Sequence, residues 1–383
     1  MLKSFIFFDF GREAIVYRHQ LQQINTFVSK TKNMIDIELL NDICTIPGAP
    51  GFEQRIRERI IREVTPYADE LTIDNMGNVY AIRKGKENKR VMIGAHMDEI
   101  GFIVTHIDDK GFIRFHTLGG FDPKTLTAQR VIIHGKKDII GVMASKPIHV
   151  MTQDERNKTA KLSDYFIDTG LSAEEVKELI QIGDSVTRER EFIEMGNCVN
   201  GKSLDNRLAV YISIELLKEL EGKELPYDLY VVFTVQEEVG IRGANVAALN
   251  IKPDFGFGLD TTIAFDLPGA AAHEMITRLG EGTAIKLMDA STICDYRMVD
   301  FMKKTADRHL IKWQPEILTA GGTDTAGIQR MTEGGSIAGA VSIPTRHLHQ
   351  VIEMAHKDDI RASIDLLKAC VTEINQYNWK ISQ

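Results

Sequence analysis

Residues 91–101 read Val-Met-Ile-Gly-Ala-His-Met-Asp-Glu-Ile-Gly, and this stretch decides the fold. Its first half, Val91 to Ala95, is a continuous apolar run, which is typical of a strand buried on both faces of an α/β sheet. His96 and Asp98 follow where that strand ends. In open α/β sheets, ligands bind in the crevice beyond the carboxyl ends of the strands. The stretch therefore predicts an α/β sheet with a functional site at this edge.

The same alternation of strands and helices continues on both sides of one interruption. Before residue 103 and after residue 195, apolar runs with strand length alternate with segments of helical periodicity. This alternation of strands and helices predicts an α/β fold with a mainly parallel sheet and helices on both faces. The expected strands are 79–83, 91–95, 229–235, 255–259 and 336–343, and the expected helices are 35–46, 52–66, 206–220, 244–249, 296–309 and 357–377.

Residues 103–195 have a different sequence pattern. Short stretches of alternating apolar and polar residues, such as Gly111–Phe115 and Arg130–Ile133, are separated by turn residues. This pattern predicts a small β-rich module with one helical stretch near its end. We therefore expect a catalytic domain in two parts, 34–102 and 196–383, interrupted by the module. Residues 1–33 are expected to be an N-terminal extension, with Met34 as an alternative start of the natural chain.

Charge and cysteine usage exclude several classes of partner. The 383 residues include 54 acidic and 46 basic residues, a net charge of −8, which argues against nucleic acid or an anionic membrane as the main partner. No apolar run approaches the ~20 residues that span a bilayer. The cysteines form no CxxC pair, which predicts reduced thiols and a cytoplasmic protein. They are Cys44, Cys198, Cys294 and Cys370.

Four further segments carry polar, ligand-type residues at the ends of apolar elements. Asp205 opens a helix, Glu237 and Glu238 follow a very apolar strand, and Asp260 ends the next strand. Taken singly, each has a plainer interpretation: Asp205 as a helix N-cap, the glutamates as a solvated turn, and Asp260 as an Asx turn. His96 alone is equally compatible with a structural histidine. Neighbouring side chains diverge in extended backbone, so one glutamate can bind metal while the other faces substrate.

A fifth segment ends in His347 and His349, which are two residues apart. Their spacing does not decide which of the two is a ligand, and both could be exposed loop histidines. Together with the acids they form a mixed nitrogen and oxygen donor set suited to Zn²⁺, Co²⁺ or Mn²⁺. Acids gathered in one cleft would repel one another without cations. A pair of divalent ions about 3.5–4 Å apart needs a bridging carboxylate, and an unligated carboxylate would take the proton of the attacking water.

The ordered motifs resemble one known family. AHMDEIGF (95–102), LDNR (204–207), QEEVG (236–240), GGTD (321–324) and IPTR-x-x-H (343–349) are similar to those of the tetrahedral aminopeptidases, which are cytosolic dinuclear-metal enzymes. The resemblance covers residues from about 40 to 372. It implies peptide substrates, two Zn²⁺ or Co²⁺ ions per subunit, a dimerisation role for the inserted module, and a homododecamer built from dimers.

The resemblance also implies roles for the matching residues. It makes His96 and Asp260 ligands of the first metal, and it makes Asp205 the bridge between the two metals. Glu238 and His349 would bind the second metal. The remaining implied roles are Glu237 as general base, Asp98 as support for His96, and Gly321, Gly322 and Thr323 as lining of the substrate site. His347 stands where the family usually has an aromatic residue, so it could contact metal or substrate.

The expected function is a metal-dependent aminopeptidase that hydrolyses the N-terminal peptide bond through a metal-bridged water. The alternatives are another metal-dependent amide hydrolase, such as a deacylase, and a scaffold with an inert metal site. A glycosidase that uses Glu237 and Glu238 as its acid pair is a further alternative. Glycosidases place two carboxyl groups across the scissile bond, about 5–9.5 Å apart, for which neighbours on one strand are poorly placed.

Overall fold

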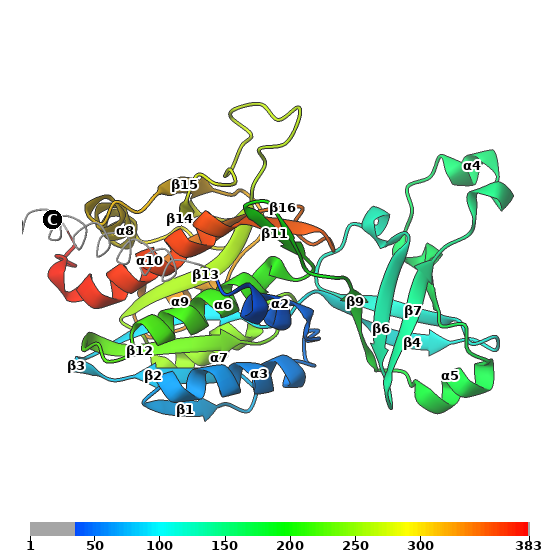
Figure 1. Cartoon of the computed structure of the whole chain (residues 1–383), viewed down its shortest axis with the longest axis horizontal. Helices are drawn as coiled ribbons and strands as arrows, with labels where there is room; N and C mark the ends of the chain where they lie inside the picture. The colour runs from blue at the N-terminus through cyan, green and yellow to red at the C-terminus, as the bar shows by residue number, and fades with distance from the viewer. Residues whose placement is uncertain (1–34, 382–383) are drawn as a thin grey trace, which may run out of the picture. The chain divides into compact units, whose positions relative to one another are not determined.

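The computed structural model describes residues 35–381, and the expected extension at residues 1–33 and the alternative start at Met34 lie outside this range. The described residues form an eleven-stranded mixed sheet and a separate closed barrel (Figure 1). No helix in this range is long and apolar enough for a membrane span.

The four central strands of the sheet run parallel, as predicted. They are β12 (Leu225–Thr234), β3 (Gly85–His96), β13 (Phe255–Ile263) and β16 (Ile337–Arg346), adjacent in this order. Antiparallel strands flank them, so the sheet is parallel at its centre and mixed towards its edges. The outer strands are β1 (Glu70–Ile73), β2 (Val79–Arg83), β10 (Ile193–Met195), β11 (Cys198–Gly201), β14 (Thr283–Met288), β15 (Trp313–Ile317) and β17 (Glu353–His356).

Helices cover both faces of this sheet (Figure 1). One face carries α2 (Ile37–Thr45), α3 (Gln54–Val64), α6 (Leu204–Glu219) and α10 (Lys357–Glu373). The other face carries α7 (Arg242–Ile251) and α9 (Thr325–Arg330), while α8 (Tyr296–Arg308) packs on β14, β16 and α10. Short 3-10 turns follow α3 at Thr65–Tyr67 and α10 at Ile374–Gln376, so the last helix ends earlier than the expected residue 377.

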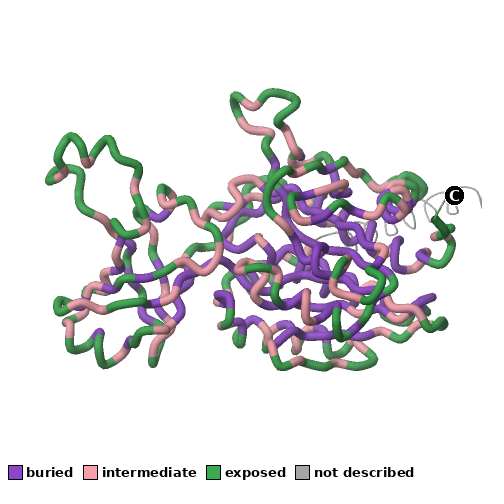
Figure 2. Tube along the Cα trace, turned by 180° about the vertical axis from the view of Figure 1, so that it is seen from behind, coloured by how far each residue is buried: buried purple, intermediate pink, exposed green. Residues whose placement is uncertain are grey.

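The core lies on both sides of the sheet, and Figure 2 shows buried backbone running through the centre of the α/β part. Under α7 and α9, side chains such as Met92 and Val232 pack against Ala247 and Ile328. Gly258 on β13 allows α9 to approach closely, because a Cβ at this position would lie 1.9 Å from Oγ1 of Thr325. This close packing places the turn before α9 beside the carboxyl end of β13.

The inserted module is a closed six-stranded barrel with a core of its own. Its strands run from Gly101 to Glu189, whereas β10 pairs with β11 in the large sheet. The barrel is therefore shorter than the expected 103–195 at its C-terminal end. Its strands are β4 (Gly101–Ile107), β5 (Ile113–Leu118), β6 (Gln129–His134), β7 (Asp138–Ala144), β8 (Phe166–Asp168) and β9 (Ser185–Glu189). Its helical elements are η2 (Pro123–Leu126), η3 (Ile148–Val150), α4 (Gln153–Arg156), η4 (Leu162–Asp164) and α5 (Ala173–Leu179).

Candidate metal centre

The carboxyl ends of the parallel strands bring the predicted polar residues together. His96 is the last residue of β3, Asp260 lies in β13, and Glu237 and Glu238 follow the end of β12. Because these three strands are parallel, their carboxyl ends meet at one edge of the sheet. Asp205 comes from the first turn of α6, which lies over the same strands.

Two groups of potential ligand atoms form at this edge, and Asp205 belongs to both. Site 1 consists of His96, Asp205 and Asp260, and site 2 consists of Asp205, Glu238 and His349; within each site the ligand atoms lie within 4.8 Å of one another. Oδ1 of Asp205 is 3.3 Å from Nε2 of His96, and Oδ2 is 3.3 Å from Nε2 of His349. The two oxygens of one carboxylate therefore face two different imidazoles.

Burial and crowding make this edge electrostatically unusual. Burial lowers the pKa of His96, but Asp260 and Asp205 oppose this effect and hold the pKa well above its ordinary value. Burial raises the pKa of Asp205, while hydrogen bonds with His349 and His96 bring it well below the usual range. Burial and the neighbouring Asp205 raise the pKa of Glu238 to about 8. The positive charges that act on these carboxylates are those of the two histidines and, at Asp260, that of Lys286.

The donor set fits divalent cations. Each site offers one imidazole nitrogen and carboxylate oxygens, which is a combination that Zn²⁺ and Co²⁺ accept. Oε1 of Glu238 is buried and has no hydrogen-bond partner among residues 35–381. A buried acceptor without a partner costs free energy, and a cation at this position would remove that cost.

Asp98 connects the end of β3 to the turn that follows β12. Its Oδ1 accepts the backbone N–H of Glu237 at 3.1 Å, and its Oδ2 accepts that of Glu238 at 3.2 Å. Nδ1 of His96 lies 3.1 Å from the backbone oxygen of Asp98 and 3.5 Å from Oδ1 of the same residue. A carbonyl or carboxylate oxygen behind a ligating imidazole fixes the tautomer and orientation of the ring. Asp98 is thus placed to orient His96 and both glutamates.

Glu237 reaches the same centre without belonging to either site. Its Oε2 lies 3.8 Å from Nε2 of His96. Burial is the main cause that raises the pKa of Glu237 well above its ordinary value; His96 opposes this rise, and Asp260 and Glu238 add to it. Glu237 is therefore a carboxyl group beside site 1 that belongs to neither site.

Sequence reasoning missed three buried acids that support the centre. Glu53 accepts the backbone N–H of Gly51 at 2.7 Å and that of Gln236 at 3.2 Å, and burial raises its pKa to about 7. Glu353 accepts the N–H groups of Asp205 and His349. Asp324, which accepts the hydroxyl of Thr234, lies in the GGTD motif, and this motif was its only signal in the sequence.

A cavity of about 530 Å³ opens onto the two sites. Gly321, Gly322 and Thr323, for which the resemblance implies a place in the substrate site, are among the residues that line it. His347 is not among the described residues that line the cavity, and it belongs to neither site; Leu348 and His349 occupy that wall instead. The remaining lining residues include Gly120, Ile241, Thr261, Thr262, Ile263, Lys286, Ser291, Leu318 and Ala320.

Lys286 in this lining was not predicted from the sequence. Its side chain is fully buried, with Nζ 2.8 Å from Oε1 of Glu316 and 3.3 Å from Oδ2 of Asp289. Burial lowers the pKa of Lys286, but Glu316 and Asp289 oppose this effect and raise it above the ordinary value. The lysine is thus a charged part of the cavity wall.

Comparisons with known proteins agree with this geometry. The model of the M42 glutamyl aminopeptidase family matches residues 77–366. A putative aminopeptidase of Acetivibrio thermocellus is 40% identical over 331 residues, covering 86% of this chain and 96% of the relative. The lysyl aminopeptidase of Pyrococcus furiosus is 32% identical over 350 residues, covering 89% and 98%. The structure of the Pyrococcus horikoshii TET1 peptidase superimposes with a TM-score of 0.80 at 32% identity, covering 88% and 99%; that peptidase can assemble into a tetrahedron or a large octahedral shell.

Proposed function

The chain belongs to the M42 glutamyl aminopeptidase family and is a metal-dependent aminopeptidase, and we propose on this premise that two divalent cations would occupy the two sites that share Asp205. The observation that carries the proposal is the position of Asp205, whose two oxygens each lie 3.3 Å from a different imidazole. His96 and Asp260 complete one site, and Glu238 and His349 complete the other. Zn²⁺ and Co²⁺ both suit these donors. When bound, such cations polarise a carbonyl oxygen and make a neighbouring water more acidic.

The chain's own residues then perform the proton transfers. Glu237 accepts the proton of the attacking water and later delivers it to the leaving amine, because it reaches the centre without being a ligand. The free α-amino group of a peptide would be held at one of the two cation sites, which would confine hydrolysis to the first peptide bond. Gly321, Gly322 and Thr323 form the wall that faces the substrate.

Replacement of the proposed base tests this mechanism. Glu237→Gln should lower kcat/KM for aminoacyl-anilides by about 10²–10⁴-fold, because the amide cannot take the proton. Its bound metal, measured by atomic emission, should equal that of the wild type. Glu333→Gln, which changes an exposed glutamate, is the matched control and should keep wild-type activity. Near-normal turnover by Glu237→Gln would refute the assignment of the base.

Metal removal tests the cofactor. A chelator should abolish hydrolysis, and full activity should return at two equivalents of Zn²⁺ or Co²⁺ per chain. Because the cations bind only the folded state, they should also raise the thermal unfolding midpoint of the metal-free protein. Calorimetric titration that saturates at a single equivalent would contradict the dinuclear centre.

A panel of leucyl-, lysyl- and glutamyl-anilides in the hydrolysis assay would establish the preferred N-terminal residue.

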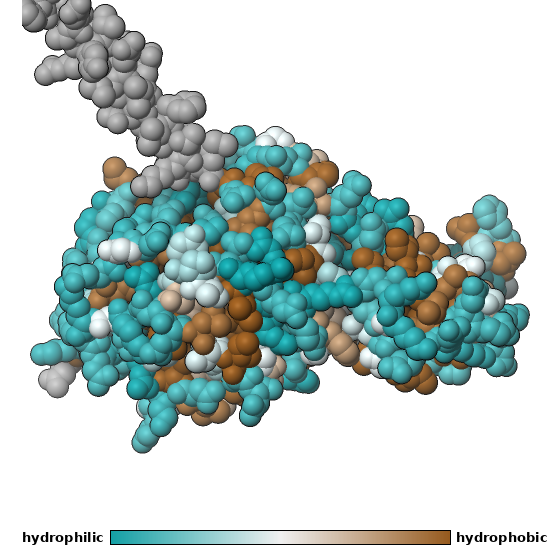
Figure 3. Space-filling view, turned by 60° about the horizontal axis from the view of Figure 1, so that its bottom comes forward, coloured by the Kyte–Doolittle hydropathy of each residue, from teal (hydrophilic) through white to brown (hydrophobic). Residues whose placement is uncertain are grey.

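The proposal extends to self-association through the barrel, and ultimately to a dodecamer built from dimers. Apolar side chains lie at the surface of this module, visible at the right of Figure 3, and Ile140 is 60% exposed. Val142, Ile148 and Val150 are also exposed. Exposed apolar patches are typical of interfaces.

The four cysteines carry free thiols, which supports the cytoplasm as the location of the enzyme.

A further inference from the structure

The two sites differ in how they are built. The unshared members of site 1, His96 and Asp260, are buried and come from central strands of the sheet. His349, by contrast, belongs to the segment after β16, its side chain is 39% exposed, and its backbone has φ +62°. A partly exposed histidine in a left-handed conformation needs additional contacts to hold its ring in one orientation. The contacts of the ring and the backbone of His349 therefore show which parts of the chain hold site 2 in place.

The ring of His349 is held by the barrel. Its Nδ1 lies 2.9 Å from the backbone oxygen of Gly120, in the loop between β5 and η2. A carbonyl oxygen can only accept, so Nδ1 carries the hydrogen in this bond. Nε2 is therefore left without a hydrogen in the neutral ring and faces Asp205 at 3.3 Å and Glu238 at 3.6 Å. The barrel thus fixes the tautomer that a metal ligand requires.

The preceding residue, Gly119, brings the same loop against the other unshared member of site 2. Its φ is +101°, a conformation that favours glycine. A Cβ there would lie 2.4 Å from Cγ2 of Ile100 and 3.4 Å from Cβ of Glu238. The φ of Gly119 and its close contact with Ile100 therefore require glycine, while the loop meets Glu238 at an ordinary contact distance.

The backbone of His349 is held separately, by the α/β part. Oε1 of Glu353 accepts the N–H of His349 at 2.8 Å, and Oε2 accepts the N–H of Asp205 at 3.0 Å. Glu353 lies in β17 and is fully buried. The α/β part therefore determines where His349 lies, and the barrel determines which nitrogen it presents to site 2.

We propose that the Gly119–Gly120 loop of the barrel is a positioning element for site 2, so that the barrel sets the metal affinity of site 2 while site 1 depends on the α/β part alone. This inference rests on the proposed dinuclear function. It assigns the inserted module a role at the active site that is separate from any role in self-association. Outer partners of metal ligands typically change metal affinity about 10–100-fold when they are altered.

Stepwise Zn²⁺ titration of the metal-free, full-length protein by calorimetry tests the proposal. Asp260→Asn and Glu238→Gln first assign the two binding steps to site 1 and site 2. Gly119→Ala should then weaken the site 2 step by about 10–100-fold and leave the site 1 step within about twofold of wild type. Gly170→Ala is the matched control, because this barrel glycine also has a positive φ and its added Cβ would meet no atom within 4 Å. It should leave both steps unchanged.

A second variant keeps the test decisive if Gly119→Ala folds poorly. At Gly120 an added Cβ would lie 3.5 Å from Nδ1 of His349, which is an ordinary contact distance. Gly120→Ala should therefore fold and weaken the site 2 step by a smaller factor. Unchanged affinities in both variants, or equal weakening of both steps, would overturn the positioning role while leaving the dinuclear centre intact. Fewer than two steps in the wild type would instead remove the proposed function, and this inference with it.

Discussion

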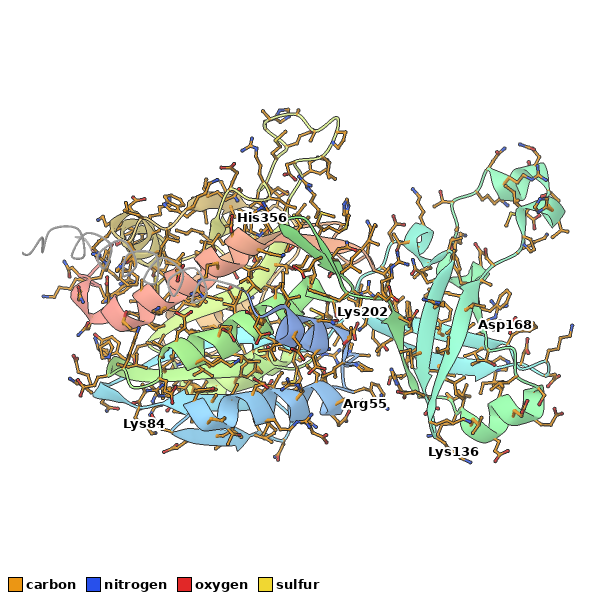
Figure 4. All side chains as sticks on the ribbon, in the orientation of Figure 1. Arg55, Lys84, Lys136, Asp168, Lys202 and His356 are labelled. Carbon is orange, nitrogen blue, oxygen red and sulfur yellow. The ribbon has the colours of Figure 1, made fainter. Side chains whose placement is uncertain are left out.

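A buried salt bridge lies close in sequence to two of the proposed metal ligands, His96 and Asp205. Nζ of Lys202 is 2.7 Å from both carboxylate oxygens of Glu99, and both side chains are almost inaccessible to solvent. Figure 4 labels Lys202 where the α/β part meets the barrel. Nη2 of Arg207 lies 3.8 Å from the same carboxylate, and its Nε donates to the backbone oxygen of Met97. These charges tie the end of β3 to the start of α6, the two segments that carry His96 and Asp205.

Lys202→Met should lower the free energy of unfolding by about 3–5 kcal/mol, because it leaves Glu99 buried with weaker compensation. Urea denaturation of the metal-free protein measures this change. The double variant Lys202→Met/Glu99→Met should recover part of the loss, since it removes both buried charges. Lys84→Met is the control: Lys84 forms an exposed pair with Glu70, and its loss should cost less than about 1 kcal/mol. An equally small effect at Lys202 would contradict the structural role of the pair.

Polar residues at the ends of apolar elements, together with the family resemblance that singled out His349, predicted the residues that the structure brings together in both sites. These signals did not reveal the residues that hold the two sites in place. Glu53 contacts the backbone of Gln236, and Lys202 contacts Glu99, across more than a hundred residues of sequence in each case. No local pattern marks a glutamate or lysine whose partner is set only by the folded chain. His347 and His349 show the same limit, because only the turn that follows β16 decides which histidine faces the cavity.

At the level of elements, sequence reasoning found the four central strands and β2 of the large sheet, and it missed the other outer strands. The central strands are continuous apolar runs, and such runs are easily recognised. β1 is exposed along most of its length, and β15 contains Pro315, which is tolerated at a sheet edge but weakens the sequence signal of a strand. α9 spans only six residues and follows two glycines. These elements form because neighbouring strands and helices already lie beside them.

One ion pair links α3 to the barrel. Arg55 in α3 donates to both carboxylate oxygens of Asp138 at the start of β7, at 2.6 and 2.8 Å, and His134 lies 2.8 Å from the same carboxylate (Figure 4 labels Arg55). Arg55, together with His134, lowers the pKa of Asp138 to about 2. The folded pKa is thus below the unfolded value, so this pair stabilises the fold at neutral pH and loses its effect in acid.

Asp138→Asn should lower the free energy of unfolding at pH 7 by about 1 kcal/mol or less, since the pair is partly exposed. The difference from wild type should shrink as the pH falls from about 4 towards 2, where the wild-type carboxylate becomes protonated. Urea denaturation at pH 7, 5, 4 and 3 measures it. Asp168→Asn, whose side-chain oxygen can still accept the N–H of Gly170, is the control. A difference in the free energy of unfolding that grows in acid would contradict the stabilising role of the pair between Arg55 and Asp138.

At the scale of the whole molecule, the barrel surface is the part to test for self-association. Ile140→Asp/Val142→Asp places two charges on exposed apolar positions of β7. If this face is the contact between copies, burial of these charges becomes unfavourable, and light scattering should give a smaller particle than the wild type. Ile73→Asp on β1, where the side chain is 50% exposed, is the control and should keep the wild-type mass. An unchanged particle in the double variant would exclude this face as the contact.

The order of strands in the large sheet also determines when β3 can pair with its neighbours during translation. β3 ends at His96, but its two neighbours in the sheet, β12 and β13, begin only at Leu225 and Phe255. At about 5–20 residues per second, a ribosome needs roughly six to thirty seconds to bridge that gap. All six barrel strands emerge within it. The nascent barrel is therefore complete first, and the buried half of β3, Val91–His96, must remain without its two sheet neighbours until translation supplies them.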